Sequence, residues 1–423
     1  MTTRDPGRWR PLAGVLAAIA VSETGTRISA VAIPWLVLVT TGSATRTGLV
    51  AFCELAPYVA AQGLTGPLLD RIGPRRLSWT TDLVSAAVAG LIPVLHLLHA
   101  LPFWPLPVLV AVIGTVRGPG DQGKQVMVLD VARRGRLPLE RVTGLAGVTE
   151  RLATTVGPAA GGVLVAVFDP FTGVAANAAC FLLGSVIVGV TLPRGIGSPK
   201  RPAQDAEPQG YWRRFGVGLA FLRQDRLLLT IVGMVSATNL LDQGFSAVLL
   251  PVWVHDTGGG PAELGLISSV RGLAAVGGSL VAAAVAHRLR RRLVFFTGYL
   301  VAGAPRFLVL ALHFPLWTIL VVSAAGSVGA GFLNPILGAI PFERVPEHLL
   351  GRVMSLINSL YWTGIPLGGL VAGVAVTAIG LTPVLVTAGG LYFLVTSLAG
   401  LRPEWREMDR RRAADRDYAV PLA

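Results

Sequence analysis

The sequence predicts an all-α membrane protein with twelve transmembrane helices arranged as two pseudo-symmetric six-helix bundles. Hydrophobic residues make up 52% of the 423 residues and charged residues only 14%, and the mean hydropathy is +0.63. A water-soluble chain of this length could not bury so much apolar surface. Apolar runs of span length recur along the chain, and a polar, proline-rich segment divides them into two sets of six.

Each membrane helix needs about 20 predominantly apolar residues, and Gly, Pro and charged residues mark where the runs end. The first bundle is expected within 1–192, with spans near 11–40, 47–69, 77–99, 105–131, 141–167 and 171–192. The second is expected within 226–401, with spans near 226–254, 262–287, 293–313, 315–340, 352–379 and 381–401. We interpret the basic amino terminus and its apolar run as a retained first span, because the run is too long for a signal-peptide core.

Between the bundles, 193–225 is predicted to be a polar, proline-rich linker on the cytoplasmic side. From Tyr211 to Arg226 the chain alternates large apolar residues with arginines, which predicts an amphipathic helix on the membrane surface. Residues 402–423 are expected to form a cytoplasmic tail.

The net charge of +13 indicates orientation rather than a nucleic-acid partner. In the connections assigned to the outer side, Arg46 is the single basic residue. Five more are placed within spans, namely Arg27, Arg117, Arg151, Arg271 and Arg306. The remaining 30 of 36, Lys124 among them, are assigned to the opposite side. Because basic residues concentrate in cytoplasmic loops, we expect a multi-pass protein of the cell membrane with both termini in the cytoplasm.

The loop between the second and third spans carries a spaced set of glycines and charged residues: Gly66, Asp70, Arg71, Gly73, Arg75 and Arg76. It resembles the G-x-x-x-D-R-x-G-R-R signature loop of the major facilitator superfamily, and it departs from that pattern at Pro74, which precedes the final two arginines. The resemblance implies the two-bundle transporter fold and a cytoplasmic gate in which Asp70 binds neighbouring helix ends, such as the start of the eleventh span near Gly351. In the second half, the matching segment has Ala286 at the position of the aspartate, so we expect an asymmetric gate.

The fifth span contains a cluster of small residues with one proline: Gly157, Pro158, Gly161 and Gly162. With Gly144 it resembles the antiporter signature of drug exporters in this superfamily, although Ala153 replaces a glycine of that signature. Ordinary helix packing through small residues is the alternative interpretation. In the fourth span, Arg117 begins a stretch that resembles the superfamily's R-x-x-x-G element, whose arginine is often tied to proton coupling.

The spacing of Gly118, Gly123 and Lys124 imitates a phosphate-binding loop. Gln125 replaces the required Ser or Thr, and the preceding residues form a membrane span rather than a strand, so nucleotide binding is rejected. No histidine pair has the spacing of a metal site, and no cofactor is expected.

Charged residues within spans are costly, at about 2.5–3.5 kcal/mol each near mid-membrane, so we expect them to be paired around a central cavity. The residues proposed for this proton or substrate cavity are Glu23, Arg27, Glu54, Arg117, Glu150, Arg151, Asp242 and Arg271. Glu23 and Arg27 are four residues apart and can pair on one helix face. Glu150 and Arg151 point about 100° apart, so each needs a partner on another helix. Asp82 is interpreted as a support for the Asp70 loop.

Segments near both ends of the chain resemble the macrolide and siderophore efflux branch of the superfamily, among them Ala32 to Leu36 and Gly351 to Ser355. The sequence therefore predicts a monomeric secondary transporter, not an enzyme, that exports a small amphipathic compound or drug in exchange for protons. A proton-coupled nutrient importer and a lipid or lysolipid transporter remain alternatives.

Overall fold

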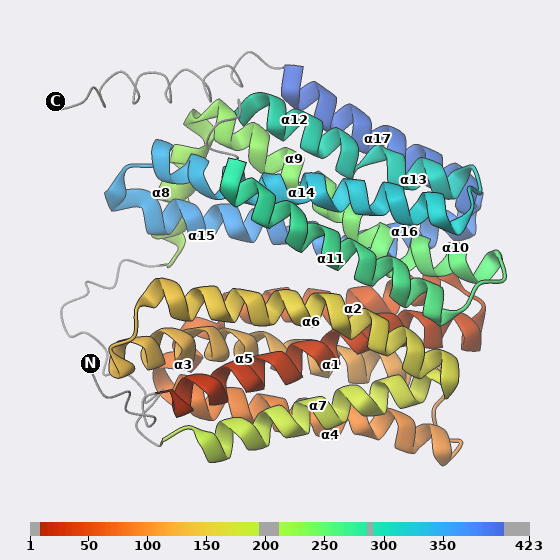
Figure 1. The fold of residues 1–423 in the computed structure, drawn as a ribbon, viewed down its shortest axis with the longest axis horizontal. Coiled ribbons are helices and arrows are strands. Elements are labelled where there is room, and N and C mark those ends of the chain that lie inside the picture. The colour runs from red at the N-terminus through yellow and green to blue at the C-terminus, as the bar shows by residue number, and fades with distance from the viewer. Residues whose placement is uncertain (1–8, 194–210, 286–290, 402–423) are drawn as a thin grey trace. The chain divides into compact units, whose positions relative to one another are not determined.

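The computed structural model describes residues 9–193, 211–285 and 291–401, and these are almost entirely helical (Figure 1). Most of the expected linker, the tail at 402–423 and Ala286 in the second-half counterpart of the gate loop lie outside the described residues.

The first half of the chain forms six helical runs of span length, the second of which is divided into two helices. Their bounds are α1 (Arg10–Thr41), α2 (Ala44–Gly63), α3 (Thr65–Ile72), α4 (Pro74–Leu97), α5 (Pro105–Gly135), α6 (Leu139–Val167) and α7 (Pro170–Thr191). Gly73 joins α3 to α4 with φ +85°, a conformation that favours glycine. Ser43 and Asp169 cap the amino ends of α2 and α7 by accepting backbone N–H hydrogen bonds.

The second half begins with α8 (Tyr211–Gln224), which confirms a helix at the expected amphipathic segment. Six further runs follow, and three of them are interrupted. Their bounds are α9 (Arg226–Gly244), the π-helical turn η2 (Phe245–Leu249), α10 (Leu250–Asp256), α11 (Pro261–Val285), α12 (Arg291–Ala302), α13 (Ala304–Ala311), α14 (Leu316–Arg344), α15 (Glu347–Thr363), α16 (Ile365–Ile379) and α17 (Leu381–Leu401).

Nine of the helical runs within the described residues are long and apolar enough to cross a membrane. The other three runs of span length, α2, α5 and α6, carry the charged residues Glu54, Arg117 and Glu150, each accompanied by further charges. The prediction of twelve helical runs is therefore confirmed, and the three less apolar runs are among those expected to hold buried charges.

The helices form two compact units. Unit 1 comprises Met1–Asp205, Ser246–Ser269 and Gly369–Thr377, and unit 2 comprises Ala206–Phe245, Val270–Gly368 and Ala378–Ala423. In unit 1, α1 packs against α6 and α7, while α4 and α5 pack together and α5 also contacts α2. In unit 2, α12 packs against α14, and α17 contacts α9, α12 and α13.

Candidate functional site

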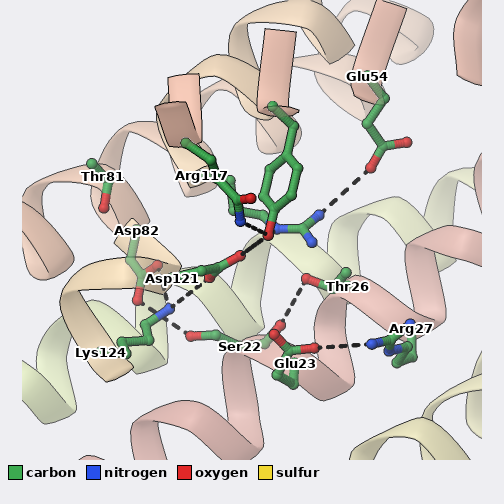
Figure 2. A network of polar contacts seen from close by, with 12 residues as sticks. Ser22, Glu23, Thr26, Arg27, Glu54, Thr81, Asp82, Arg117, Asp121 and Lys124 are labelled. Atoms are coloured by element: carbon green, nitrogen blue, oxygen red, sulfur yellow. Dashed lines mark hydrogen bonds and ion pairs between the residues drawn. The ribbon is translucent and has the colours of Figure 1, made fainter. Parts of the chain in front are cut away.

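A network of polar side chains runs through unit 1, with contributions from α1, α2, α4 and α5 (Figure 2). It contains one carboxylate more than it has basic groups. The carboxylates are Glu23, Glu54, Asp82 and Asp121, and the basic groups are Arg27, Arg117 and Lys124. Such a cluster inside apolar helices is the arrangement expected of buried, mutually compensating charges.

Arg117 on α5 lies between two carboxylates. Its Nη1 is 3.6 Å from Glu54 Oε1 on α2, and its Nε is 3.2 Å from Asp121 Oδ2 one turn along α5. The guanidinium also stacks on the ring of Tyr58, 5.0 Å from its centroid. Tyr58 in turn donates its hydroxyl proton to Asp121 at 3.3 Å and accepts a hydrogen bond from Gln62 at 2.9 Å. Arg117 therefore contacts one carboxylate on α2 and one on its own helix, α5.

Asp121 links Arg117 to a more deeply buried pair. Its Oδ1 is 3.7 Å from Lys124 Nζ, and Lys124 donates to Asp82 Oδ1 on α4 at 2.8 Å. The other oxygen of Asp82 accepts from the Ser22 hydroxyl at 3.2 Å. Lys124 is 3% exposed and Asp82 1% exposed. The expectation that Lys124 belongs to the inner surface is therefore wrong, and so is the interpretation of Asp82 as a support for the Asp70 loop.

Glycines on α5 allow the neighbouring helices to approach these charges. A Cβ at Gly114 would overlap the backbone carbonyl of Glu54, and one at Gly118 would lie 2.9 Å from the carbonyl oxygen of Tyr58. On another face of α5, a Cβ at Gly123 would lie 3.0 Å from the carbonyl oxygen of Pro74 on α4. The glycines and lysine that imitate a phosphate loop thus serve helix packing and a buried ion pair.

Glu23 and Arg27 form the ion pair that their spacing predicts, with Oε2 and Nη2 3.5 Å apart. Glu150 and Arg151 on α6 are exposed, and neither has an ion pair within the described part of unit 1. The expected partner on another helix of unit 1 is therefore not found for these two residues.

The gate-loop residues lie on α3, at the Gly73 connection and on the start of α4. Asp70 and Arg71 are exposed, while Arg75 donates to the backbone carbonyl of Gly189 on α7 at 2.7 Å. This bond ties the loop to the carboxyl-terminal turn of α7. The binding of Asp70 to a helix of the other bundle stays a prediction.

The antiporter-like cluster lies where α6 crosses α1. A Cβ at Gly157 would overlap the Arg27 side chain, and one at Gly161 would lie 2.9 Å from Ile28 Cα. Gly162 faces the start of α11, where a Cβ would lie 2.9 Å from Gly265 Cα. These glycines allow close helix packing beside the Glu23–Arg27 pair.

Unit 2 contains a cavity of about 530 Å³ between its helices. Polar and aromatic side chains on several helices line it, including Asn239, Asp242, Arg271, Tyr299, Arg306, Tyr361, Trp362 and Tyr392. Its charged residues are one carboxylate and two arginines, the reverse of the balance in unit 1. An aromatic wall with a few charged groups is typical of a small-molecule site.

Arg306 on α13 pairs with Asp242 on α9, and aromatic rings surround its guanidinium. The centroids of Phe245, Phe307 and Tyr392 lie 4.8, 5.0 and 5.5 Å from Arg306 Cζ. Arg306 is 8% exposed, whereas the side chain of Asp242 is 40% exposed. Arg271 also stacks on Phe245, at 5.4 Å.

Helix interruptions shape this cavity. The π-helical turn η2 follows directly after α9, on which Asp242 lies, and such turns are frequent at functional sites. The break between α12 and α13 falls at Gly303, where a Cβ would overlap the Tyr392 ring. The break lets Tyr392 approach the turn that begins α13 and carries Arg306.

Four of the residues that the sequence predicts for a cavity lie in these two sites, namely Glu54, Arg117, Asp242 and Arg271. The sequence analysis did not predict Asp121 and Lys124 as site residues, and it did not assign Arg306 to the cavity. A signal was present, because all three are charged residues within helical runs of span length. Among the described residues, no group of three or more His, Cys, Asp or Glu side chains is placed to hold a metal ion.

The family model described as transmembrane secretion effector matches residues 5–422 of this chain. The chain belongs to this transporter family of the major facilitator superfamily. The two polar sites are therefore those of a transmembrane secretion effector.

Two curated relatives cover nearly the whole chain. The multidrug efflux pump Tap of Mycobacterium tuberculosis (strain H37Rv) is 31% identical over 418 residues, which cover 97% of this chain and 97% of Tap. Macrolide efflux protein A of Streptococcus pyogenes is 22% identical over 93% of this chain and 96% of that protein.

Solved structures of major facilitator transporters share the fold of this transmembrane secretion effector. The nucleoside transporter NupG is similar with a TM-score of 0.70 and 12% identity, over 95% of this chain and 99% of NupG. The peptide transporter POT in complex with sulfate gives a TM-score of 0.69 and 14% identity, over 95% of each chain. The predicted major facilitator fold of two six-helix bundles is confirmed.

Proposed function

We propose that this protein exports small amphipathic compounds, including drugs, from the cell in exchange for protons, by alternating access of its two bundles. The position of Arg117 between Glu54 and Asp121 carries the proposal. When a proton neutralises one carboxylate, the attraction of Arg117 to the other is favoured, so proton binding changes which helices the arginine holds together. The names of the relatives, multidrug efflux pump and macrolide efflux protein, support drug export as the direction and substrate class.

The energy source in this proposal is the proton gradient, and no cofactor takes part. A proton that moves inward releases about 2.3 kcal/mol per 100 mV of membrane potential, which is available for export. The partially exposed Glu54, whose side chain is 26% accessible, gives protons a route to the network that Asp82 and Lys124 lack.

We also propose a membrane orientation and an oligomeric state for the protein. Both termini face the cytoplasm of a cell-membrane protein, which the sequence-based assignment of 29 of 36 basic residues to one side supports, once the buried Lys124 is taken out of the original 30. The exporter works as a monomer whose partners are its substrate and the bilayer, without nucleic acid, and it changes no covalent bond of its substrate.

Transport assays in inverted membrane vesicles test the proposal with a macrolide and a fluorescent drug as probes. An imposed pH gradient is expected to drive accumulation in vesicles that carry the wild-type protein. In Glu54→Gln and Asp121→Asn, gradient-driven accumulation is expected to fall by about tenfold, because a charge-assisted contact of Arg117 is lost. Gradient-independent exchange of labelled for unlabelled drug is expected to persist, which separates coupling from folding.

Asp130→Asn is the matched control, because Asp130 lies on the same helix in a partly exposed ion pair with Arg134. It is expected to leave transport unchanged. Full gradient-driven transport in both network variants would contradict the role of Arg117. Failure of both a pH gradient and a sodium gradient to move either probe would contradict drug export itself.

A further inference from the structure

A second cavity in unit 2 lies away from the polar sites, where the end of α17 packs against the beginning of α9. Its volume is about 610 Å³. Two arginines, Arg223 at the end of α8 and Arg226 at the start of α9, line one part of it, and the rest is mainly apolar, with Leu229, Met234, Val395 and Leu398. The cavity thus combines positive charge with a hydrocarbon-like wall.

No acidic side chain lines this cavity in the described part of unit 2. Asp225 lies between the two arginines in sequence, but both of its oxygens are engaged elsewhere. Oδ2 accepts from Arg344 Nε at 2.6 Å, and Oδ1 accepts from the backbone N–H groups of Leu227 and Leu228 that begin α9. The cavity therefore keeps a charge of +2 that is complementary to an anionic group.

The apolar part of the cavity follows α9 and α17 into the membrane-spanning region. Leu229 and Leu398 are 44% and 62% exposed, so their side chains are available to lipid. Gly233 widens the groove, since a Cβ there would have no atom within 4 Å. From Arg226 to Gly233 a helix rises about 10 Å, which is less than the thickness of one leaflet's hydrocarbon layer, about 15 Å.

We propose that this cavity binds an anionic phospholipid, with the phosphodiester at Arg223 and Arg226 and an acyl chain along α9 and α17. Basic pockets at the ends of membrane helices bind lipid headgroups of this kind. A free phosphate ion would leave the apolar wall without a ligand, and the cationic group of a zwitterionic lipid finds no carboxylate there. The site belongs to neither polar network, so it adds a lipid ligand to a transporter of small molecules.

Native mass spectrometry of the detergent-purified full chain tests this, with palmitoyl-oleoyl-phosphatidylglycerol and the corresponding phosphatidylcholine titrated in parallel. The wild type is expected to retain phosphatidylglycerol in preference to phosphatidylcholine, and inorganic phosphate is not expected to displace it. In Arg223→Gln/Arg226→Gln, the affinity for phosphatidylglycerol is expected to fall by about thirtyfold. Arg133→Gln/Arg134→Gln removes the same charge from the end of α5 and is expected to have no such effect.

A steric variant tests the acyl-chain groove without changing the charge. Gly233→Phe fills the open space beside α9 and is expected to reduce phosphatidylglycerol retention while both arginines remain. Equal retention of the two lipids by the wild type would overturn the proposal. Retention unchanged by both the arginine and glycine variants would overturn it too, as would an equal loss in the α5 control. Because the readout is binding, it stands apart from the outcome of the transport assays.

Discussion

The two polar sites place charge among apolar helices by different means. In unit 1, ion pairs follow one another from Glu54 to Arg117, Asp121, Lys124 and Asp82, and each basic group contacts at least one carboxylate. In unit 2, Arg306 has one carboxylate partner and is otherwise surrounded by aromatic rings beside an open cavity. In the proposed function, the first arrangement responds to protonation of its carboxylates, while the second offers aromatic surface and positive charge to a ligand.

The largest effect is expected where the ion pair is most deeply buried. Lys124→Met leaves the Asp82 carboxylate without its cation, and removing one partner of a buried pair costs about 3–5 kcal/mol. The thermal unfolding midpoint in detergent is expected to fall steeply, and the yield of folded protein with it. The double variant Lys124→Met/Asp82→Asn is expected to recover most of the loss.

Arg134→Met is the control for this prediction, because it breaks the partly exposed pair with Asp130 on the same helix, worth less than about 1 kcal/mol. If Lys124→Met unfolds at the same temperature as this control, the buried pair in unit 1 contributes nothing to stability, and the contrast between the two units is lost.

A smaller effect is expected from the packing that brings α2 to α5. Gly114→Ala forces a Cβ against the Glu54 carbonyl, and overpacking of this kind costs about 1–3 kcal/mol. The matched substitution in unit 2 is Gly233→Ala, where the added carbon meets open space. We expect the unfolding midpoint to fall for Gly114→Ala and to stay level or rise for Gly233→Ala. Equal shifts would show that close approach at Gly114 is not what holds the network.

The smallest effect concerns the aromatic surroundings of Arg306. Arg306→Lys keeps the charge but loses the planar guanidinium, and cation–π contacts of this kind are worth about 0.5–2 kcal/mol. The expected result is weaker substrate binding, measured by drug-induced quenching of intrinsic tryptophan fluorescence. Arg27→Lys in unit 1, where Glu23 is the ion-pair partner seen among the described residues, is expected to leave binding unchanged. Identical affinities in the two variants would show that the aromatic rings around Arg306 do not distinguish it from Arg27, which has a carboxylate partner and no such rings in the described part of unit 1.

The sequence was sufficient for the fold and for local pairs, but not for pairs between helices. Span lengths follow from hydropathy, and the Glu23–Arg27 pair follows from helix geometry alone. Which face of α5 meets α4, and therefore that Lys124 reaches Asp82, depends on helix rotation and on glycine contacts that only the packed structure defines. The sequence shows Arg306 as a charge within a span. The aromatic rings around it come from residues far apart in the chain, such as Phe245 and Tyr392, so their contact with Arg306 is known only from the structure.

Asp121 gives unit 1 a property that simple one-to-one pairing lacks. Because Lys124 lies 3.7 Å from its Oδ1, this carboxylate still faces a cation when Arg117 turns toward Glu54. When Arg117 turns toward Glu54, Asp121 therefore keeps a cation beside it, whereas Glu54 has no second cation within the described part of unit 1 and needs a proton when Arg117 turns away. In the proposed exchange, the neighbouring lysine thus lowers the electrostatic cost of moving Arg117 from Asp121 toward Glu54.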